Sequence, residues 1–298
     1  MGKIGILIDP HITDRHRCRC DNFLDTALDK LDFVASNNDY VVIAGDLFHT
    51  SSNTNYIFYR VYQLMTKHAG KFFAIPGNHD LVHNNLEALE KTTIGSLALT
   101  GALNLQFSTF KIDNAEFQVS HVFKNLEALP VDETNSKVLI GHNYLEMPAV
   151  AKESFTREEL RNLNYKLVFL GHDHKPYDEE LLGDSILIRM GSLTRIDTQA
   201  YNKDRKIYYY QLDSQTLEYE KKEIPSQPVR QIYTEEAYNR MGRVKEEVSF
   251  IKIGDVLSKF KKKQGGVNSL HEKLIKIASQ PEIDYIKTVH ELNSVRYF

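Results

Sequence analysis

Five short segments rich in aspartate, asparagine and histidine are the parts of this chain best suited to chemistry. Carboxylate and amide oxygens and imidazole nitrogens are ligands that hold hard and borderline divalent ions. Half of the twelve histidines lie in these segments, so we expect them to share one site. The segments are Asp9-Pro10-His11, Gly45-Asp46-Leu47-Phe48-His49, Gly77-Asn78-His79-Asp80, Gly141-His142 and Gly171-His172-Asp173-His174.

The spacing of these residues indicates a pair of metal ions and the hydrolysis of phosphate esters. Two divalent ions about 3.5–4 Å apart stabilise both the attacking and the leaving oxygen at phosphorus. Such a pair needs a bridging ligand, for which the carboxylate of Asp46 is the candidate. Asp9 and His11 are two residues apart, as are His172 and His174, so each pair can point to one side beyond a strand end. The predicted ligands are Asp9, His11, Asp46, Asn78, His142, His172 and His174.

Each of the five segments directly follows a short apolar run. The runs cover residues 4–8, 40–44, 72–75, 138–140 and 167–170. Short apolar runs bounded by glycine or proline are typical of buried strands. In α/β folds the loops at the carboxyl ends of such strands carry the functional site, because the sheet holds them rigidly.

The remaining pattern predicts an α/β fold with two sheets. Residues 21–35 and 55–68 have apolar positions three and four apart, as expected of helices with one buried face. Strands that alternate with such helices favour a largely parallel sheet with right-handed crossovers. Later segments are typical of antiparallel strands, around residues 107–112, 116–120, 186–190, 205–212 and 217–224. We therefore expect a four-layer α-β-β-α sandwich.

A change in amino-acid composition near residue 225 predicts a domain boundary. Residues 225–228 read Pro-Ser-Gln-Pro, which is typical of a connection between domains. The prediction is a catalytic domain over residues 1–224 and a small C-terminal extension over residues 225–298. The extension has a lysine-rich run at 259–263 and an amphipathic helical pattern at 268–278.

Composition excludes several classes of protein. The chain has 298 residues, 42% of them hydrophobic, and no apolar run of eighteen residues, so we expect no membrane contact. A formal net charge of -3 gives no global preference for nucleic acid. The two cysteines, Cys18 and Cys20, are too few for a disulfide framework. Because the first strand begins almost at Met1, we expect a cytoplasmic protein.

Taken in order, the five segments resemble the calcineurin-like metallophosphoesterase superfamily over roughly residues 4–195. Within that superfamily, residues 45–49 look like the Mre11/SbcD exonuclease branch, and bacteriophage homologues of that branch are similarly compact. The Ser/Thr phosphoprotein phosphatases carry Asp and Arg-Gly after the same Gly-Asp, and this chain lacks them. The loop at residues 190–195 also looks like the Gly-Ser loop that follows the last histidines in the exonuclease branch.

The resemblance implies a role for each residue. It also implies Mn2+ as the metal, because the family usually prefers that ion. Asp46 would bridge two ions. His79 would contact the scissile phosphate, and His49 would help to position the phosphodiester. The first ion would also be held by Asp9, His11 and His174, and the second by Asn78, His142 and His172.

Other polar residues are open to two interpretations. Asp80 either orients His79 through a hydrogen bond or only closes its turn. Several cations near the last motif either contact DNA phosphates or form a solvated surface. These candidates for DNA contact are Arg189, Arg195, Lys203 and Arg205.

The resemblance also suggests partners. The helix at residues 55–68 either forms a homodimer bundle or only packs on the sheet, and tyrosines on it suit both. The helix predicted from residue 268 would dock on an SMC-like ATPase. The extension is too short for a full DNA-capping domain together with a linker and a partner-binding helix, so we expect a reduced cap.

These observations favour an Mn2+-dependent DNA nuclease subunit that works with an SMC-like ATPase in DNA repair or recombination. The first alternative is a metallophosphoesterase acting on nucleotides or cyclic phosphodiesters, which would have the same active site. The second alternative is a scaffold without activity. Retention of His79 together with all the predicted ligands argues against a scaffold.

Overall fold

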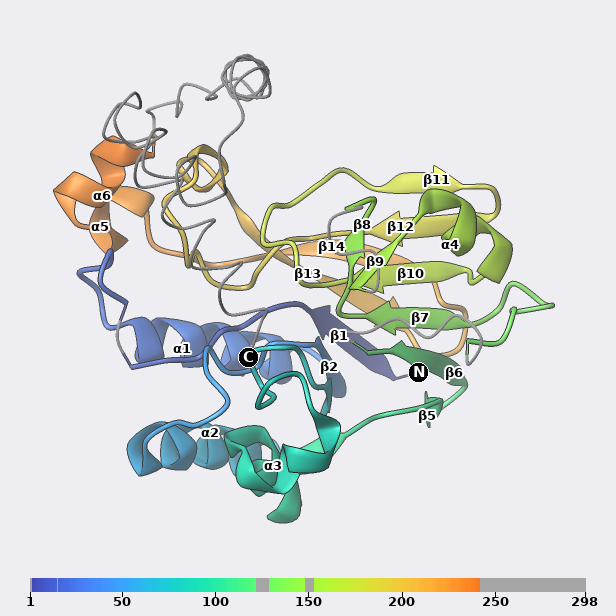
Figure 1. Cartoon of the computed structure of the whole chain (residues 1–298), viewed down its shortest axis with the longest axis horizontal. Helices are drawn as coiled ribbons and strands as arrows, with labels where there is room; N and C mark the ends of the chain where they lie inside the picture. The colour runs from blue at the N-terminus through green and yellow to red at the C-terminus, as the bar shows by residue number, and fades with distance from the viewer. Residues whose placement is uncertain (1, 15, 122–128, 148–152, 242–298) are drawn as a thin grey trace, which may run out of the picture. The chain divides into compact units, whose positions relative to one another are not determined.

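Two β-sheets packed face to face form the centre of the fold. The computed structural model describes residues 2–14, 16–121, 129–147 and 153–241 (Figure 1). In this part of the chain the first sheet has the strand order β14-β13-β1-β2-β3-β4. β1 to β4 are parallel, and β13 is antiparallel to β1 and β14. Its strands are β1 (Lys3–Leu7), β2 (Tyr40–Ala44), β3 (Phe72–Ile75), β4 (Asn104–Leu105), β13 (Ile207–Asp213) and β14 (Tyr219–Ile224).

The second sheet has the strand order β11-β12-β10-β7-β6-β5. Its four central strands are parallel, and β5 and β11 at its edges are antiparallel to their neighbours. The segment near residue 186, predicted as antiparallel, forms β12, which is antiparallel to β11 but parallel to β10. The strands are β5 (Phe110–Ile112), β6 (Ala115–Ser120), β7 (Val138–Gly141), β10 (Leu167–Leu170), β11 (Glu180–Leu182) and β12 (Ser185–Ile188). After β7, the strands β8 (Tyr144–Leu145) and β9 (Ser154–Phe155) form a small separate pair.

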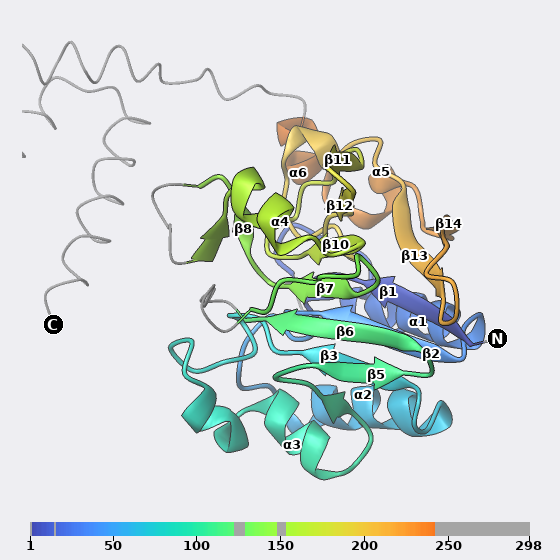
Figure 2. The same cartoon turned by 90° about the vertical axis from the view of Figure 1, so that its right-hand side faces the viewer.

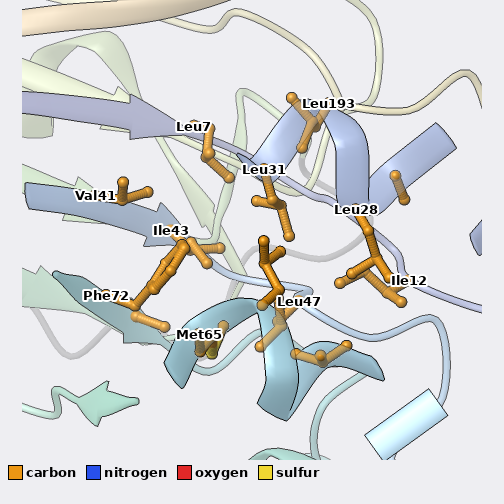
Figure 3. Packing of buried hydrophobic residues seen from close by; sticks show 14 of the residues in the cluster. Leu7, Ile12, Leu28, Leu31, Val41, Ile43, Leu47, Met65, Phe72 and Leu193 are labelled. Atoms are coloured by element: carbon orange, nitrogen blue, oxygen red, sulfur yellow. The ribbon is translucent and has the colours of Figure 1, made fainter. Parts of the chain in front are cut away.

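Helices cover the outer face of each sheet, which makes four layers (Figure 2). α1 (Phe23–Ser36), α2 (Asn55–Lys67) and α3 (Thr93–Leu99) lie on the first sheet, and α4 (Arg157–Leu163) lies on the second. Alternate residues of β2 face opposite layers: Ile43 packs with the helices, and Val42 packs between the sheets. Figure 3 shows the helix-facing cluster, in which Met65 approaches Ile43 and Phe72. The predicted sandwich of two sheets flanked by helices is confirmed.

Caps and apolar faces explain where the two long helices form. The side chain of Asn22 accepts a hydrogen bond from the backbone N–H of Asp25 at the start of α1. Thr54 does the same for Ile57 at the start of α2. Both helices match the predicted ranges within two residues, which is the usual uncertainty of helix ends.

Two short helices close the described part of the chain. α5 (Val229–Ile232) and α6 (Glu235–Arg240) form a small core that includes Tyr233 and contacts Cys18. The chain divides into two compact units, Met1–Gly242 and Arg243–Phe298, so residues 225–241 belong with the first unit. The lysine-rich run and the helix predicted from residue 268 lie outside the described residues.

In the described part of the chain, two short 3-10 helices lie between the longer elements. The 3-10 helices η1 (Leu86–Lys91) and η4 (Ala200–Asn202) precede α3 and β13 respectively. In the ranges given above, none of the helices combines the length and apolarity needed to cross a membrane. Cys18 and Cys20 are not joined in a disulfide.

Candidate metal centre

The site forms where the parallel strands of both sheets end. β1, β2 and β3 lead into the turns of Asp9, Asp46 and Asn78, and because the strands are parallel these turns lie along one edge. β7 and β10 do the same in the second sheet for His142 and His172. Several of these turns adopt left-handed backbone, with φ of 50° at Asp9, 47° at Asp46 and 83° at His172. Such φ values are uncommon outside glycine and are found at functional sites that need a sharp turn.

The predicted ligands fall into two groups around Asp46. In the first group, ligand atoms of Asp9, His11 and His174 all lie within 4.8 Å of one another. The Nε2 atoms of His11 and His174 are 2.9 Å apart, and His11 Nε2 is 3.4 Å from Asp46 Oδ2. Asp46 Oδ2 therefore lies next to the first group, where a bridging ligand would be needed.

The second group consists of Asp46, His142 and His172, whose ligand atoms also lie within 4.8 Å of one another. His142 Nε2 is 3.2 Å from Asp46 Oδ2 and 3.0 Å from Asn78 Oδ1. His142 Nδ1 lies 3.2 Å from the carbonyl oxygen of Ala44. Because a carbonyl only accepts, Nδ1 carries the proton and Nε2 is left as the ligand nitrogen. The structure thus brings all seven predicted ligands together.

Unsatisfied polar atoms in this cluster fit divalent ions. Asp9 Oδ1, Asp46 Oδ2 and His172 Nε2 are buried and make no hydrogen bond within the described part of the chain. Buried polar atoms are normally hydrogen-bonded, so a cluster of buried polar atoms without hydrogen bonds indicates that a binding partner belongs there. Carboxylate, amide and imidazole donors suit a divalent ion without redox chemistry. The residues present therefore fit a metal pair.

Glycines allow the ligand-bearing turns to approach one another. A Cβ atom at Gly45 would lie 2.1 Å from His142 Nδ1, and one at Gly77 would lie 2.1 Å from Asp46 Oδ1. Both distances are shorter than any van der Waals contact, so a larger residue at either place would displace a ligand.

Burial and charge set the protonation of the ligands before a metal binds. Burial lowers the pKa of His11 well below its ordinary value. Burial and the neighbouring His142 lower the pKa of His172 to about 3. Burial opposes a charge on His142 as well, but Asp46 and Asp9 outweigh it and raise the pKa of His142 well above its ordinary value. Metal ligation needs neutral imidazoles, so an incoming cation would replace the proton of His142.

His79 and His49 lie beside the first ligand group. Their rings are stacked with centroids 5.4 Å apart, and His79 Nδ1 donates to the carbonyl oxygen of His49 at 2.7 Å. The His79 ring is 4.9 Å from that of His11. His11, His49 and His79 also bring ligand atoms within 4.8 Å of one another, a third group that shares His11 with the first. Burial lowers the pKa of His49.

The side chain of Asp80 binds backbone N–H groups of two neighbouring turns. Its carboxylate accepts hydrogen bonds from the N–H groups of Leu47 (3.1 Å), Phe48 (2.9 Å) and Gly77 (3.0 Å). Burial and the nearby Asp46 raise the pKa of Asp80 to about 7. Of the two interpretations of Asp80, these contacts agree with the one in which it closes the turn, because its carboxylate ties the turn of Asp46 to the turn of Asn78. The ring of His79 is held instead by the carbonyl of His49.

Two of the four cations considered for DNA contact lie inside the protein. Arg195 and Arg205 are only 4% and 7% exposed. Arg195 donates to the carbonyl of Gln227 at 3.2 Å, and Arg205 donates to the carbonyl of His174 at 3.2 Å. Burial lowers the pKa of Arg205 to about 10. Their burial corrects the DNA-contact prediction for both arginines, because their guanidinium groups hold the loop after β12 in place.

The other two cations remain candidates for DNA contact. The guanidinium of Arg189 lies 3.7 Å from the ring centroid of Tyr177. Lys203 Nζ lies 5.7 Å from that of Tyr238.

Some residues near the ligands carried no sequence signal. Glu153 Oε2 lies 3.7 Å from His172 Nε2, and Asp197 Oδ2 lies 4.0 Å from His174 Nδ1. The ring of His16 is 6.4 Å from that of His49. None of the three follows a strand within a motif, so only packing in three dimensions shows that they are near.

Comparison with known proteins defines the class. A family model described as calcineurin-like phosphoesterase matches residues 9–176. The chain belongs to this family, whose members are metal-dependent hydrolases of phosphoesters. No curated protein matches the chain.

Two of the solved structures that match the chain are distant in sequence. The protein TT1561 of Thermus thermophilus is 15% identical, with a TM-score of 0.45, over 75% of this chain and 99% of its own. A protein serine/threonine phosphatase from Saccharomyces cerevisiae, with similarity to human phosphatase PP5, is 14% identical with a TM-score of 0.39. That match covers 78% of this chain and 82% of the phosphatase. Similarities at this level carry no argument about substrate.

Proposed function

We propose that this phosphoesterase is a Mn2+-dependent DNA nuclease of the Mre11/SbcD type. The observation that supports this proposal is the position of His49. Its ring stacks on His79 beside the first ligand group, with centroids 5.4 Å apart. A second histidine that is not a ligand, next to the phosphate-contacting one, is the feature by which residues 45–49 resemble the nuclease branch.

In this proposal each group of residues has a task. The first ion would be held by Asp9, His11 and His174, the second by Asn78, His142 and His172, and both by Asp46. When bound, the two divalent ions supply a water of lowered pKa and offset negative charge on the phosphate. A hydroxide formed from that water, with its proton lost to solvent, would bond to phosphorus as the ester P–O bond breaks, and the leaving oxygen would need a proton.

His79 supplies the proton that the leaving oxygen needs. Because Nδ1 of His79 donates to the carbonyl of His49, Nδ1 is protonated and Nε2 is the nitrogen left to act on the leaving oxygen. Only the imidazolium form has a proton at Nε2 to donate. The stacked His49 ring limits movement of His79 and borders the place where the phosphodiester would lie.

A small-substrate phosphodiesterase is the second candidate, and one observation favours it. Arg195 and Arg205 are buried, which removes two of the four cations expected to bind a DNA backbone. Together with a net charge of -3, this leaves a weaker electrostatic attraction for a polyanion.

Parallel hydrolysis assays distinguish the two candidates. The full chain, loaded with Mn2+, is incubated with single- and double-stranded DNA and with bis-p-nitrophenyl phosphate and cyclic nucleotides. We expect cleavage of DNA, and an Asp46→Asn variant should abolish it. Strong turnover of the small esters without cleavage of DNA would reverse the order of the candidates.

The proposal includes two protein partners. Tyr56 and Tyr59 on α2 are 56% and 55% exposed, and aromatic side chains of this kind are common at interfaces. α2 would therefore form a homodimer contact, which a Tyr59→Arg variant should weaken in sedimentation experiments. An SMC-like ATPase would be the second partner, and co-purification of a coiled-coil ATPase from a native host tests it.

A further inference from the structure

A cavity of about 590 Å³ opens directly beside the ligand groups. His172 from the second group and His174 from the first both line it, so it borders the positions of both ions. Its volume is within the range of pockets that hold small ligands, and it suits a group the size of one nucleotide. A group in this cavity would therefore lie next to a phosphate held at the two ligand groups.

Two tyrosines form aromatic walls of the cavity. The ring of Tyr144, on β8, packs on His172 with centroids 3.8 Å apart. Tyr201, on η4, donates its hydroxyl to Asp197. Asp197 is fixed in turn, because it accepts hydrogen bonds from Gln199 N at 2.9 Å and Asn202 Nδ2 at 2.7 Å. Rings held in this way are suitable platforms for a stacked base.

The charged side chains of the cavity offer little to a second phosphate. Asp173 and Asp197 bring two carboxylates, and Lys175 brings one ammonium group. Away from the ions, these side chains therefore supply no excess of positive charge, whereas a base and its sugar need none. The exposed amide of Gln199 offers both a donor and an acceptor to the edge of a base.

We propose that this cavity binds an unpaired nucleobase on the nucleotide that carries the scissile phosphate. This assignment rests on the proposed phosphodiesterase function and narrows its substrate class to nucleoside phosphodiesters with an unpaired terminal base. A base that stacks on Tyr144 or on Tyr201 in this cavity has to leave its stack in a duplex. Single-stranded and frayed ends are therefore preferred over fully paired ends.

A binding measurement tests the proposal without turnover. Calorimetry compares thymidine 5′-monophosphate with methyl phosphate on the full, Mn2+-loaded chain. The wild type should bind the nucleotide more tightly, and Tyr201→Ala should weaken nucleotide binding by on the order of tenfold, the usual effect of losing one stacking partner. Binding of methyl phosphate should not change. Tyr144→Ala should act in the same direction.

Two control variants separate stacking from other effects. Tyr201→Phe keeps the ring and loses only the hydroxyl, so it should retain most of the nucleotide affinity. Tyr208→Ala removes a partly buried tyrosine of β13 that does not line the cavity, and it should behave as the wild type. Circular dichroism establishes that each variant is folded.

The outcomes separate this proposal from the proposed function. If Tyr201→Ala and Tyr144→Ala leave the ratio of nucleotide to methyl phosphate affinity unchanged while bis-p-nitrophenyl phosphate is still hydrolysed, the cavity proposal is overturned and the enzyme class stands. If no phosphodiester is cleaved but both variants lose nucleotide affinity, the cavity assignment stands and the proposed function is overturned.

Discussion

His79 is the residue whose environment says most about its chemistry. Its Nδ1 is occupied by the carbonyl of His49 at 2.7 Å, and its backbone N–H donates to Asp46 Oδ1 at 2.9 Å. The ring is therefore held by its neighbours at a place where no bond to a metal is needed to orient it. This separates the task of His79 from that of the ligands.

Removal of the His79 ring tests this separation. His79→Ala should still bind two Mn2+ ions per chain, because the ligand groups around Asp46 remain. Turnover of bis-p-nitrophenyl phosphate should fall by about 10²- to 10⁴-fold, the usual contribution of a positioned proton donor. Metal analysis and steady-state kinetics on the same sample measure both. Two bound ions together with undiminished turnover would contradict the role.

At the scale of elements, the strand-end turns decide whether the ligands can meet. Gly45 directly follows β2 and has a φ of 86°, and its missing side chain leaves room for His142, which directly follows β7 in the other sheet. The close approach of the two sheets at this edge therefore depends on a glycine.

Gly45→Ala tests that dependence, and Gly70→Ala is a matched control. Both glycines have left-handed φ, 86° and 80°, so alanine at either costs about 1–2 kcal/mol of folding free energy. Only at Gly45 does the new Cβ meet a ligand, because nothing lies within 4 Å of it at Gly70. Mn2+ titration should show weakened binding for Gly45→Ala alone. Equal metal affinities in the two variants would show that His142 moves aside without cost.

Arg205, in the loop after β12, binds the backbone of the metal-ligand residue His174. Arg205 donates to the carbonyl of His174, to Ser192 Oγ at 3.3 Å and to Asn202 Oδ1 at 3.2 Å. A guanidinium group can serve several acceptors at fixed angles, which an ammonium group cannot. Arg205 is therefore a positioning residue for His174.

Arg205→Lys should weaken Mn2+ binding by about 10- to 100-fold, as loss of a residue that supports a metal ligand commonly does. Lys206→Met is the control, because Lys206 is the next residue, is exposed, and bonds Glu223 at the surface. Calorimetric metal titration measures both variants, and denaturant unfolding reports their stability. Unchanged metal affinity in a folded Arg205→Lys protein would assign Arg205 to the fold alone.

At the scale of the molecule, every predicted ligand lies in the unit Met1–Gly242. The same unit contains α5 and α6, and Tyr233 beside α5 donates to the carbonyl of Arg195 at 2.7 Å. The segment after residue 224 thus contributes to the loop that also carries Arg205.

A chain that ends at Met241 should bind metal as the full chain does, whereas a chain that ends at Ile224 should bind it more weakly. The chain that ends at Met241 keeps the contact between Tyr233 and Arg195, so it should bind two Mn2+ ions and hydrolyse bis-p-nitrophenyl phosphate as the full chain does. The shorter one loses that contact and should bind metal more weakly. Equal metal binding by both folded truncations would show that the loop does not need α5 and α6.

Much of the site could be predicted from local patterns. Asp9, Asp46, Asn78 and His142 each follow a short apolar run, and burial of such runs places the next polar residues at a sheet edge. The helices were predictable for the same reason, since their apolar positions recur with the helical period.

Other features were beyond local pattern. Asp80, Arg195 and Arg205 look like surface or site residues in the sequence, yet all three are buried on backbone partners. Those partners lie far along the chain, so only packing shows that their charges are used inside the protein.

The sequence alone determined which side chains stand at the strand ends, because hydrophobic burial and the period of a strand act over neighbouring residues. Tertiary structure decided which of these ends meet. The N–H of His172 donates to Asp9 at 3.0 Å across 163 residues of chain, and the cavity beside the ligands brings together Tyr144 of β8 and Tyr201 of η4. Such contacts depend on how one sheet packs on the other, which no short stretch of sequence encodes.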